Sequence, residues 1–287
     1  MKIAITGAAG MLGVDLLKVL SKKHKVTGIC HTKKVSKFPC VHSDITNTTK
    51  IIKDIVSLKP DLVIHSAAYP DVDGCELNPD YAYKVNAIGT QNIALACQKV
   101  SASMLYISTD YVYDGTKKQP YIEFDSVNPL SVYGKSKLAG EWYVSSILNK
   151  FYIVRTAFLF GENGNNFIKA ILKNAKENDK LKVVTDLTGS PTYTVDLAQE
   201  IARLIETEYY GIYHITNKGF CSRYELAKKI LEQKGIKKQV IPSTTKTIKR
   251  PASRPKFSAL RNFCLELTIG NKMQSWEQAL ATYLKKI

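Results

Sequence analysis

Residues 2–13, KIAITGAAGMLG, place a short apolar run directly before three glycines at positions 7, 10 and 13. In a strand–turn–helix unit, the first glycine permits a tight turn, the second lets a pyrophosphate approach the backbone, and the third lets the helix pack closely on the strand. The start of that helix presents unpaired N–H groups to an anion. A plain turn can also contain such glycines, and the spacing is G-x-x-G-x-x-G rather than G-x-G-x-x-G. Because the glycines stand at the first turn of a β-α-β pattern, they favour a nucleotide site.

The first 160 residues alternate short apolar runs with longer amphipathic segments. This rhythm is typical of β-α-β units, in which helices cover a parallel sheet. The apolar runs are nearly continuous, as expected for strands that are buried on both faces. The sequence therefore predicts an α/β fold, a Rossmann-type doubly wound parallel sheet. Strands are expected to begin at Lys2, Lys25, Asp61, Ser103 and Phe151, and helices to cover residues 11–21, 48–58, 79–99 and 131–146.

Beyond residue 160 the pattern is looser, and three prolines at 242, 251 and 255 stand among basic residues. These features suggest loops around a smaller C-terminal substrate lobe. We expect a dinucleotide-binding domain over residues 1–160, onto which residues 191–217 pack back, and a substrate lobe formed by residues 161–190 and 218–287. The helices expected in this part cover residues 166–177, 194–206, 222–233 and 275–287, and the strands cover residues 181–184 and 211–216.

The composition limits the classes of partner. The 287 residues carry a formal net charge of +16, but the lysines are dispersed and stand in no nucleic-acid-binding motif. Nucleic acid is therefore not expected, and the charge suits an anionic cofactor or substrate. No run approaches the roughly 18 apolar residues that a membrane helix needs. The six cysteines form no C-x-x-C motif and no cluster with histidine, which predicts free thiols, no metal site and a cytoplasmic location.

The end of the second expected strand indicates which dinucleotide binds. The segment GICHTKKVSK, residues 28–37, offers His31, Lys33 and Lys34 but no carboxylate. An acid at this point would hold the ribose 2′-OH of NAD, whereas positive charge suits the extra phosphate of NADP. The sequence therefore predicts NADPH, with NADH and a plain basic loop as the alternatives. Asp44 could accept a hydrogen bond from the adenine amino group or cap the helix that begins near Thr48.

Tyr133 and Lys137 stand four residues apart in SVYGKSKLAGE, residues 131–141, on one face of an expected helix. A tyrosine that exchanges protons near neutral pH needs a nearby cation to stabilise its phenolate, and Lys137 can supply it. A Y-x-x-x-K match alone is expected by chance in a chain with 16 tyrosines. Two further features support it: Thr109 ends a strand with its hydroxyl in the crevice of the sheet, and Asn86 stands inside a long helix, where asparagine is unfavourable.

Several motifs together carry a family resemblance. TGAAGMLG, HSAAYPDVDGCE, VNAIGTQN, ISTDYVYDG and YGKSK look like the extended short-chain dehydrogenase/reductases. RTAFLFGENGNNF, DLTGSPTYTVDLA, GIYHIT, RPKFSAL and SWEQAL resemble, more narrowly, the dTDP-4-dehydrorhamnose reductase family. The resemblance runs from residue 3 to about residue 285. It implies NADPH-dependent reduction of the C4 keto group of a nucleotide-linked 4-keto-6-deoxy sugar, with dTDP-4-dehydro-L-rhamnose as the first substrate to test.

The resemblance implies a role for each matching residue. Tyr133 would donate the proton to the keto oxygen, and Lys137 would lower the pKa of Tyr133 and bind the nicotinamide ribose. Thr109 would hold the same carbonyl, and Asn86 would shape its helix and relay the proton. Asn165 and Asn166 would meet the diphosphate, with Arg254 and Lys256 closing from the small lobe. The cofactor-binding set is Gly7, Gly10, Met11, Leu12, Gly13, His31, Lys33, Asp44, Ile45, Ala67, Ala68, Tyr69, Tyr133 and Lys137; the substrate-binding set is Val72, Asp73, Thr109, Asp110, Tyr111, Phe158, Asn165, Asn166, Arg254 and Lys256.

Some positions depart from the family pattern. Phe158 stands where relatives often have tryptophan, so an aromatic wall remains without its hydrogen-bond donor. Relatives that dimerise through magnesium use glutamates, whereas this chain has Asp15 in the first helix and Asp196 after Val195. We therefore predict no essential metal and either a monomer or a homodimer. His65 replaces the more frequent asparagine, with no derivable consequence.

Two other functions remain open from the sequence. The chain could reduce a different nucleotide sugar, because no residue identifies the base. It could also be an NADP-binding regulatory subunit, since the β subunit of methionine adenosyltransferase has this fold and similar motifs. Against the second reading, the first strand begins at Lys2, without an extension for a partner.

Overall fold

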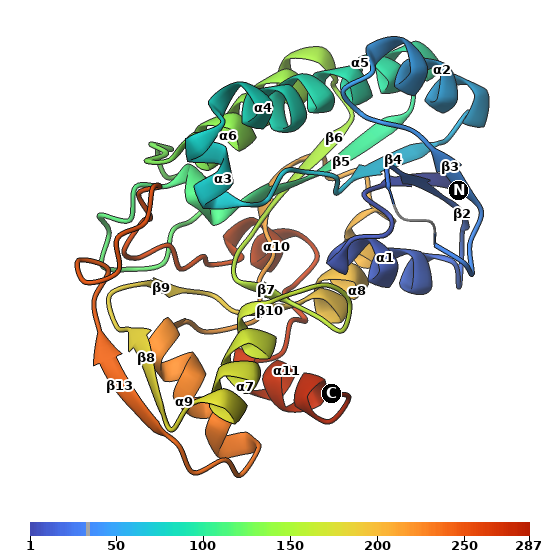
Figure 1. Ribbon diagram of the computed structural model, residues 1–287. Helices are drawn as coiled ribbons and strands as arrows, with labels where there is room; N and C mark the ends of the chain where they lie inside the picture. The colour runs from blue at the N-terminus through green and yellow to red at the C-terminus, as the bar shows by residue number, and fades with distance from the viewer. Residues whose placement is uncertain (33–34) are drawn as a thin grey trace.

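The computed structural model describes residues 1–32 and 35–287, so Lys33 and Lys34 lie outside the described residues. Its centre is a parallel sheet of seven strands in the order β11-β6-β5-β4-β1-β2-β3 (Figure 1). The predicted doubly wound α/β fold is confirmed. The strands are β1 (Lys2–Thr6), β2 (Lys25–Cys30), β3 (Cys40–His42), β4 (Leu62–His65), β5 (Ser103–Thr109), β6 (Phe151–Thr156) and β11 (Gly211–His214).

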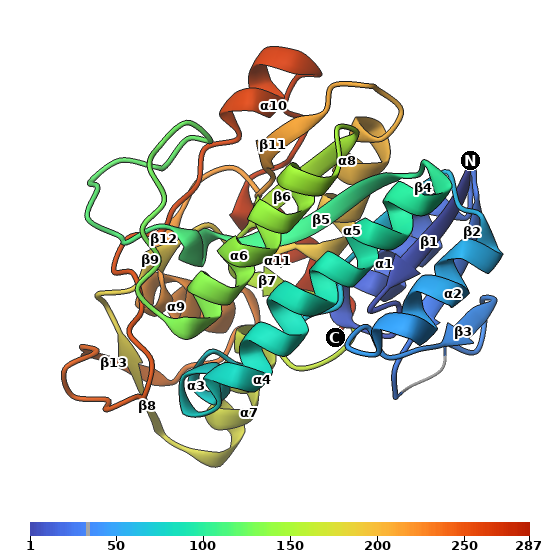
Figure 2. The same cartoon turned by 90° about the horizontal axis from the view of Figure 1, so that it is seen from above.

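Helices cover both faces of this sheet. One face packs on α1 (Met11–Leu20) and α8 (Thr194–Leu204), and the other on α2 (Thr48–Leu58), α5 (Gly89–Val100) and α6 (Val132–Ile147), which lie side by side in Figure 2. Side chains alternate along each strand, so Ile3 and Ile5 of β1 join the first layer while Ala4 joins the second. Burial on both faces explains why the strands are apolar at successive positions.

The glycines of the first turn are required by close backbone contacts. Gly7 has a φ of 65°, a conformation that side chains disfavour. A Cβ at Gly7 would lie 2.7 Å from the backbone nitrogen of Ala67, and one at Gly13 would lie 2.2 Å from the Gly7 carbonyl oxygen. Gly7 is therefore needed where the turn meets the segment after β4, and Gly13 where α1 packs on the end of β1.

The helix expected over residues 79–99 contains a π-helical turn. After α3 (Val72–Leu77), α4 (Pro79–Tyr83) runs into the π-helical turn η1 (Lys84–Ile88) and continues as α5. The side chain of Asn86, inside this turn, accepts a hydrogen bond from the Tyr69 backbone nitrogen at 2.8 Å and donates to Ser136 Oγ at 3.1 Å. The asparagine that is unfavourable in a regular helix thus binds neighbouring segments from a π-bulge, a feature often found at functional sites.

The C-terminal part has a second cluster of buried side chains. α7 (Phe167–Glu177), β8 (Lys180–Val184), α9 (Arg223–Gln233) and α11 (Trp276–Leu284) surround it, below the sheet in Figure 1. β13 (Gln239–Ser243) pairs in parallel with β8, although Pro242 suggested a loop. A proline is tolerated there because β13 is an edge strand. The short elements are η2 (Asp110–Val112), β7 (Leu159–Phe160), β9 (Thr188–Gly189), β10 (Thr192–Tyr193), β12 (Cys221–Ser222) and α10 (Phe263–Thr268).

The cysteine prediction is wrong for one pair. Cys30 and Cys40 form a disulfide between the neighbouring strands β2 and β3, where their Cα atoms lie 6.6 Å apart. A spacing of ten residues gave no sign of this pairing, which depends on the register of the two strands. Cys75, Cys97, Cys221 and Cys264 are free thiols, as predicted.

The helices of the described segments, residues 1–32 and 35–287, are all too short or too polar to cross a membrane.

Candidate active site

The expected cofactor residues meet at the carboxyl ends of β1, β2 and β4. A pocket with a volume of about 150 Å³ opens there between the glycine turn and the end of β4. Gly10 precedes α1, and Met11, Leu12 and Gly13 form the first turn of that helix. These residues follow Gly7, which lines the pocket. Of the predicted residues, those that line it are Gly7, His31, Asp44, Ile45, Ala67, Ala68 and Tyr69.

Asp44 does not cap α2, because Asn47 does so by accepting a hydrogen bond from the Lys50 backbone nitrogen. Asp44 Oδ1 instead accepts hydrogen bonds from the backbone nitrogen and hydroxyl of Thr46, at 2.8 and 2.9 Å. Its other oxygen lies 3.7 Å from His31 Nε2. Although burial alone would raise the pKa of Asp44, the Thr46 bonds and His31 hold it below its ordinary value. The carboxylate and the imidazole therefore face the same pocket.

Tyr133 and Lys137 both lie on α6, and Thr109 ends β5. Burial raises the pKa of Tyr133 well above its ordinary value, while the Thr109 hydroxyl acts in the opposite direction. Its ring also packs edge to face against Tyr111, with centroids 5.7 Å apart. Tyr133 is therefore a protonated phenol at neutral pH, the form that a proton donor requires.

Lys137 is only 2% exposed. Its ammonium donates a hydrogen bond to the Ile107 carbonyl oxygen at 2.7 Å and lies 4.1 Å from the ring centroid of Tyr106. Burial lowers the pKa of Lys137 to about 7, and Glu141 opposes this shift. A lysine with this pKa changes charge within the physiological range.

His65, whose role the sequence left open, contacts two threonine hydroxyls near Lys137 and Asn86. Its Nδ1 lies 2.6 Å from the hydroxyl of Thr6, and its Nε2 lies 3.1 Å from the hydroxyl of Thr90. Thr90 in turn donates to the Asn86 carbonyl oxygen at 2.7 Å. Burial, and then the charge of Lys137, lower the pKa of His65 to about 3. A neutral histidine therefore connects β1 to the π-helical turn.

A second and larger cleft is lined by residues 72–158 of the first part of the chain and by residues 167–258 of the C-terminal part. It has a volume of about 1350 Å³, and Val72, Tyr111, Phe158, Arg254 and Lys256 of the predicted substrate residues line it. The residues that line this cleft range from Val72 to Lys256. Because these segments lie far apart in the chain, the sequence motifs could not show that they share one cleft.

Asp73 binds two arginines that line this cleft. Arg254 grips it with two hydrogen bonds, of 3.0 Å to Oδ1 and 2.9 Å to Oδ2, and Arg250 adds one of 3.2 Å. The hydrogen bond from Arg254 is the main reason why the pKa of Asp73 is lowered. The two residues predicted to bind substrate thus bind each other across the cleft.

Asp110 is held inside the wall of the cleft. Its Oδ2 accepts from Ser258 Oγ at 2.5 Å and its Oδ1 from Thr109 Oγ1 at 3.1 Å. Burial raises the pKa of Asp110 to about 6, against the opposing effect of these bonds. Asp110 therefore positions the hydroxyl of Thr109 beside Tyr133.

Asn165 and Asn166 do not belong to the residues that line this cleft. Asn166 caps α7 by accepting from the Lys169 backbone nitrogen at 3.0 Å, and donates to Tyr283 Oη at 3.1 Å. The neighbouring Phe167 lines the cleft in their place.

Arg223 is a cleft residue that the sequence reasoning missed. Its guanidinium carbon lies 3.5 Å from the ring centroid of Phe158 and 4.7 Å from that of Phe167. Phe158 has a φ of 44°, a strained conformation for a bulky residue. The aromatic wall predicted at Phe158 is thus stacked with a cation. In the sequence, Arg223 showed only as one basic residue at a helix start.

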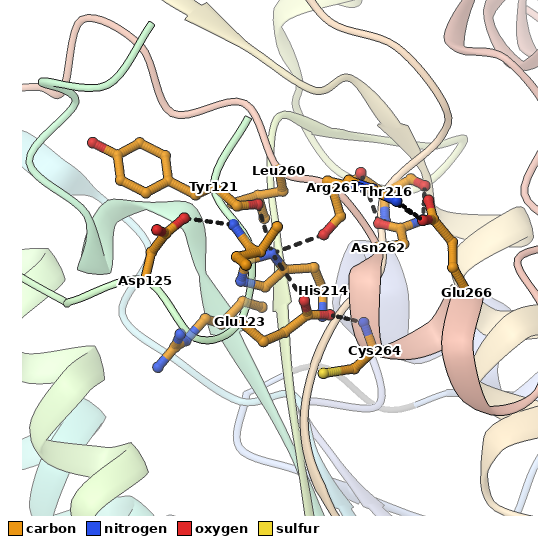
Figure 3. Close-up of polar contacts among 12 residues, drawn as sticks. Tyr121, Glu123, Asp125, His214, Thr216, Leu260, Arg261, Asn262, Cys264 and Glu266 are labelled. Carbon is orange, nitrogen blue, oxygen red and sulfur yellow. Dashed lines mark hydrogen bonds and ion pairs between the residues drawn. The ribbon is translucent and has the colours of Figure 1, made fainter. Parts of the chain in front are cut away.

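A buried polar network surrounds Glu123 and His214, as Figure 3 shows. Glu123 Oε1 accepts hydrogen bonds from the backbone nitrogens of His214 at 2.8 Å and Cys264 at 3.1 Å. His214 Nδ1 lies 3.2 Å from the Tyr121 carbonyl oxygen and 3.1 Å from that of Arg261. The network therefore joins the segments around residues 121–123 and 261–264 to the edge strand β11.

The carboxylates considered for a metal make protein contacts. Asp15 Oδ2 accepts from Thr194 Oγ1 at 2.6 Å, and Asp196 Oδ2 accepts from Asn217 Nδ2 at 2.7 Å. Within residues 1–32 and 35–287 no group of three or more His, Cys, Asp or Glu side chains could hold a metal ion.

Comparisons with known proteins extend these findings over the whole chain. The family model of the RmlD substrate binding domain matches residues 1–287. The spore coat polysaccharide biosynthesis protein SpsK of Bacillus subtilis is 37% identical over 285 residues, which cover 99% of this chain and 97% of that protein.

Two solved structures are similar over nearly their full length. The dTDP-4-dehydrorhamnose reductase of Clostridium acetobutylicum is 45% identical, with a TM-score of 0.91 and coverage of 100% of this chain and 99% of the other. The dTDP-4-dehydrorhamnose reductase of Bacillus anthracis, solved in complex with NADP, is 39% identical, with a TM-score of 0.93 and the same coverage. The similarity therefore includes the small lobe as well as the sheet.

Proposed function

The chain belongs to the family of the RmlD substrate binding domain and the dTDP-4-dehydrorhamnose reductases, and we propose that it shares their reductase chemistry. The family resemblance predicted from the sequence motifs is confirmed by this membership. The proposed reaction is the NADPH-dependent reduction of the C4 keto group of a nucleotide-linked 4-keto-6-deoxy sugar. The substrate is dTDP-4-dehydro-L-rhamnose, and the product is dTDP-L-rhamnose.

One observation carries this proposal: the phenol of Tyr133, a half-buried side chain, is protonated and interacts with the Thr109 hydroxyl. Tyr111 packs on Tyr133 and also lines the large cleft. A keto oxygen between the two hydroxyls would accept a hydrogen bond from each. Tyr133 would then donate its proton to that oxygen in the transition state, while Thr109 keeps the carbonyl in place.

The residues present fit a dinucleotide. The glycine turn and the end of β4 approach each other so closely that no side chain fits at Gly7. His31 lines the adjoining pocket, where its imidazole can donate a hydrogen bond to the extra phosphate of NADP. NADPH, when bound, supplies the hydride that reduces C4 of the sugar.

Lys137 and Asn86 complete the proposed proton path. Lys137 would stabilise the phenolate that Tyr133 leaves after donating its proton, and would bind the ribose of the cofactor. Asn86 holds the backbone of Tyr69 and the hydroxyl of Ser136. These hydrogen bonds hold the π-helical turn against α6, the helix that carries Tyr133. Tyr133 must take up a new proton after each reaction.

The cellular setting follows from the proposed substrates. NADPH and nucleotide sugars are both anionic, which suits a formal net charge of +16. We propose a cytoplasmic enzyme, a monomer or homodimer, that binds no nucleic acid and needs no metal. The two-lobe division at about residue 160 belongs to the same proposal.

The test is NADPH oxidation in the presence of a panel of nucleotide-linked 4-keto sugars. We expect the fastest turnover with dTDP-4-dehydro-L-rhamnose, and the panel identifies the base if another sugar is preferred. Absence of turnover with every sugar, together with stoichiometric capture of a methionine adenosyltransferase, would replace the enzyme by the regulatory alternative.

A further inference from the structure

Arg223 begins α9 and reaches into the large cleft, where two phenyl rings hold its guanidinium. The guanidinium carbon lies 3.5 Å from the centroid of Phe158 and 4.7 Å from that of Phe167. Stacking of this kind fixes the plane of the group but uses none of its five N–H donors, which point outward within that plane.

The side-chain donors of Arg223 have no partner in the part of the chain that the structure describes. Among the described residues, its side chain makes no hydrogen bond within 3.5 Å and no ion pair within 4.0 Å. Asp110 is a nearby carboxylate, but its oxygens accept hydrogen bonds from Ser258 and Thr109. Burial lowers the pKa of Arg223, which means that the cleft disfavours its charge. A partly buried, unpaired guanidinium is costly and is the group that an anion would satisfy.

The other arginines at the cleft are already engaged. Arg254 makes two hydrogen bonds to Asp73, and Arg250 makes one to the same carboxylate. Asp73 therefore engages the guanidinium groups of both Arg250 and Arg254. The other cations that line the cleft are lysines, which have no planar fork of donors: Lys182, Lys246, Lys249 and Lys256. This leaves Arg223 as a planar cation with unpaired donors, among the described residues, in a cleft that Tyr111 also lines.

From this arrangement we infer that Arg223 binds the diphosphate of the substrate and is a substrate-binding residue of this enzyme. The inference deepens the proposed function and rests on it. A planar guanidinium can donate two parallel hydrogen bonds to the oxygens of one phosphate or bridge two phosphates. The stacking rings keep the fork in one orientation, so the diphosphate would be bound in a fixed position relative to Thr109 and Tyr133. The chemistry also assigns a role to Phe158, which would support the cation instead of contacting the sugar.

Three variants test the inference. Arg223→Met removes the charge and the donors, Arg223→Lys keeps the charge but removes the planar fork, and Lys228→Met removes an exposed charge from the same helix as a control. Binding of inorganic pyrophosphate is measured by calorimetry on the cofactor-loaded protein, and KM and kcat are measured with the best keto sugar. Near-ultraviolet circular dichroism reports whether each variant is folded.

For Arg223→Met we expect pyrophosphate binding to weaken and KM to rise by about tenfold or more, the effect of losing charge-assisted hydrogen bonds. The kcat value and the affinity for NADPH should change by less than about threefold, because the tyrosine and the dinucleotide pocket are untouched. Arg223→Lys should lie between Arg223→Met and the wild type, and Lys228→Met should match the wild type.

Unchanged pyrophosphate binding and KM in a folded Arg223→Met protein would overturn the inference. If that variant does not fold, Arg223→Lys decides, since wild-type pyrophosphate binding in it would overturn the requirement for a planar fork. A wild-type protein that turns over keto sugars but fails to bind pyrophosphate also counts against the inference alone. A wild-type protein that binds pyrophosphate yet reduces no sugar would leave the anion site standing and reject the reductase function.

Discussion

Arg155 and Arg223 are two arginines in apolar surroundings, and their partners differ completely. Arg155, on β6, donates to both oxygens of Glu141, with its Nη2 at 2.6 Å from Oε2 and its Nε at 3.0 Å from Oε1. It also donates to Tyr113 Oη at 2.8 Å. Arg223 is stacked on two rings and has no such acceptor among the described residues.

The difference separates a structural charge from a functional one. Glu141 more than offsets the cost of burial and raises the pKa of Arg155, whereas burial lowers the pKa of Arg223. A buried ion pair holds elements of the fold in register, and losing one partner leaves the other uncompensated. An unpaired cation at a cleft contributes little to the fold and is available to a ligand. The two sites should therefore respond oppositely to mutation, in stability at one and in binding at the other.

The largest effect is expected at the paired site. Glu141→Ala removes the carboxylate from Arg155 and leaves its guanidinium buried without a counterion. We expect the free energy of unfolding to fall by about 3–5 kcal/mol. Urea unfolding followed by circular dichroism measures this change, and Arg223→Met serves as the contrast.

For Arg223→Met the loss of stacking should cost no more than about 1 kcal/mol. Equal destabilisation in both variants would mean that the cleft arginine is structural as well, and the distinction drawn here would fail.

A change next to the cleft should affect turnover without affecting stability. Tyr133→Phe keeps the ring that packs on Tyr111 but removes the hydroxyl proton. We expect kcat to fall on the order of 10²-fold or more, since a general acid contributes that much. The affinity for NADPH, measured by fluorescence titration, should remain that of the wild type. Turnover close to the wild-type value would exclude Tyr133 as the proton donor.

The pH dependence of turnover tests the buried lysine. The ammonium of Lys137 faces the Tyr106 ring and the Ile107 carbonyl. Glu141 is the charged group that acts on the pKa of Lys137, and the charge of Lys137 in turn lowers the pKa of His65. With a pKa of about 7, Lys137 loses its charge as the pH rises above neutrality. We expect kcat/KM to fall about tenfold per pH unit above that value, because the neutral amine cannot stabilise the Tyr133 phenolate.

Lys137→Met provides the control for this pH profile. It should be slow at every pH and should lack the alkaline decline. A wild-type profile that stays flat from pH ~6 to ~9 would show that the charge of Lys137 does not limit the reaction.

The sheet could be predicted from the sequence because its signals are local. Ile3, Ala4 and Ile5 are apolar and buried at successive positions. The glycines that follow are required by contacts within a few residues and with Ala67. β13 was missed because Pro242 argues against a strand unless the strand lies at an edge, and only the tertiary pairing with β8 reveals that edge. The π-helical turn at Asn86 likewise depends on a distant partner, the Tyr69 backbone.

The candidate site divides in the same way. Tyr133, Lys137 and Thr109 were found from spacing and from position at a strand end, which are properties of one element each. The partner of Arg254 and the rings that hold Arg223 come from segments far apart in the chain, so no spacing encodes them. Asn166 differs from these residues, because its side chain caps α7 and does not line the large cleft. Its role at the diphosphate stays a prediction from the family resemblance.

The smallest effect is expected at an exposed histidine, which completes the contrast with the two arginines. The side chain of His31 is 59% exposed, and Asp44 lies 3.7 Å away, so solvent and the carboxylate both weaken its pull on a phosphate. For His31→Ala we expect the ratio of kcat/KM for NADPH to that for NADH to fall only about threefold, or roughly 0.6 kcal/mol, as for other exposed charge pairs. His42→Ala is the matched control, because its ring lies 6.3 Å from that of His31 on the neighbouring strand without lining the dinucleotide pocket. An unchanged ratio in His31→Ala would show that this histidine does not recognise the phosphate. A fall of about a hundredfold would mean that an exposed side chain acts as strongly as a buried charge, and would contradict the expected order of effects.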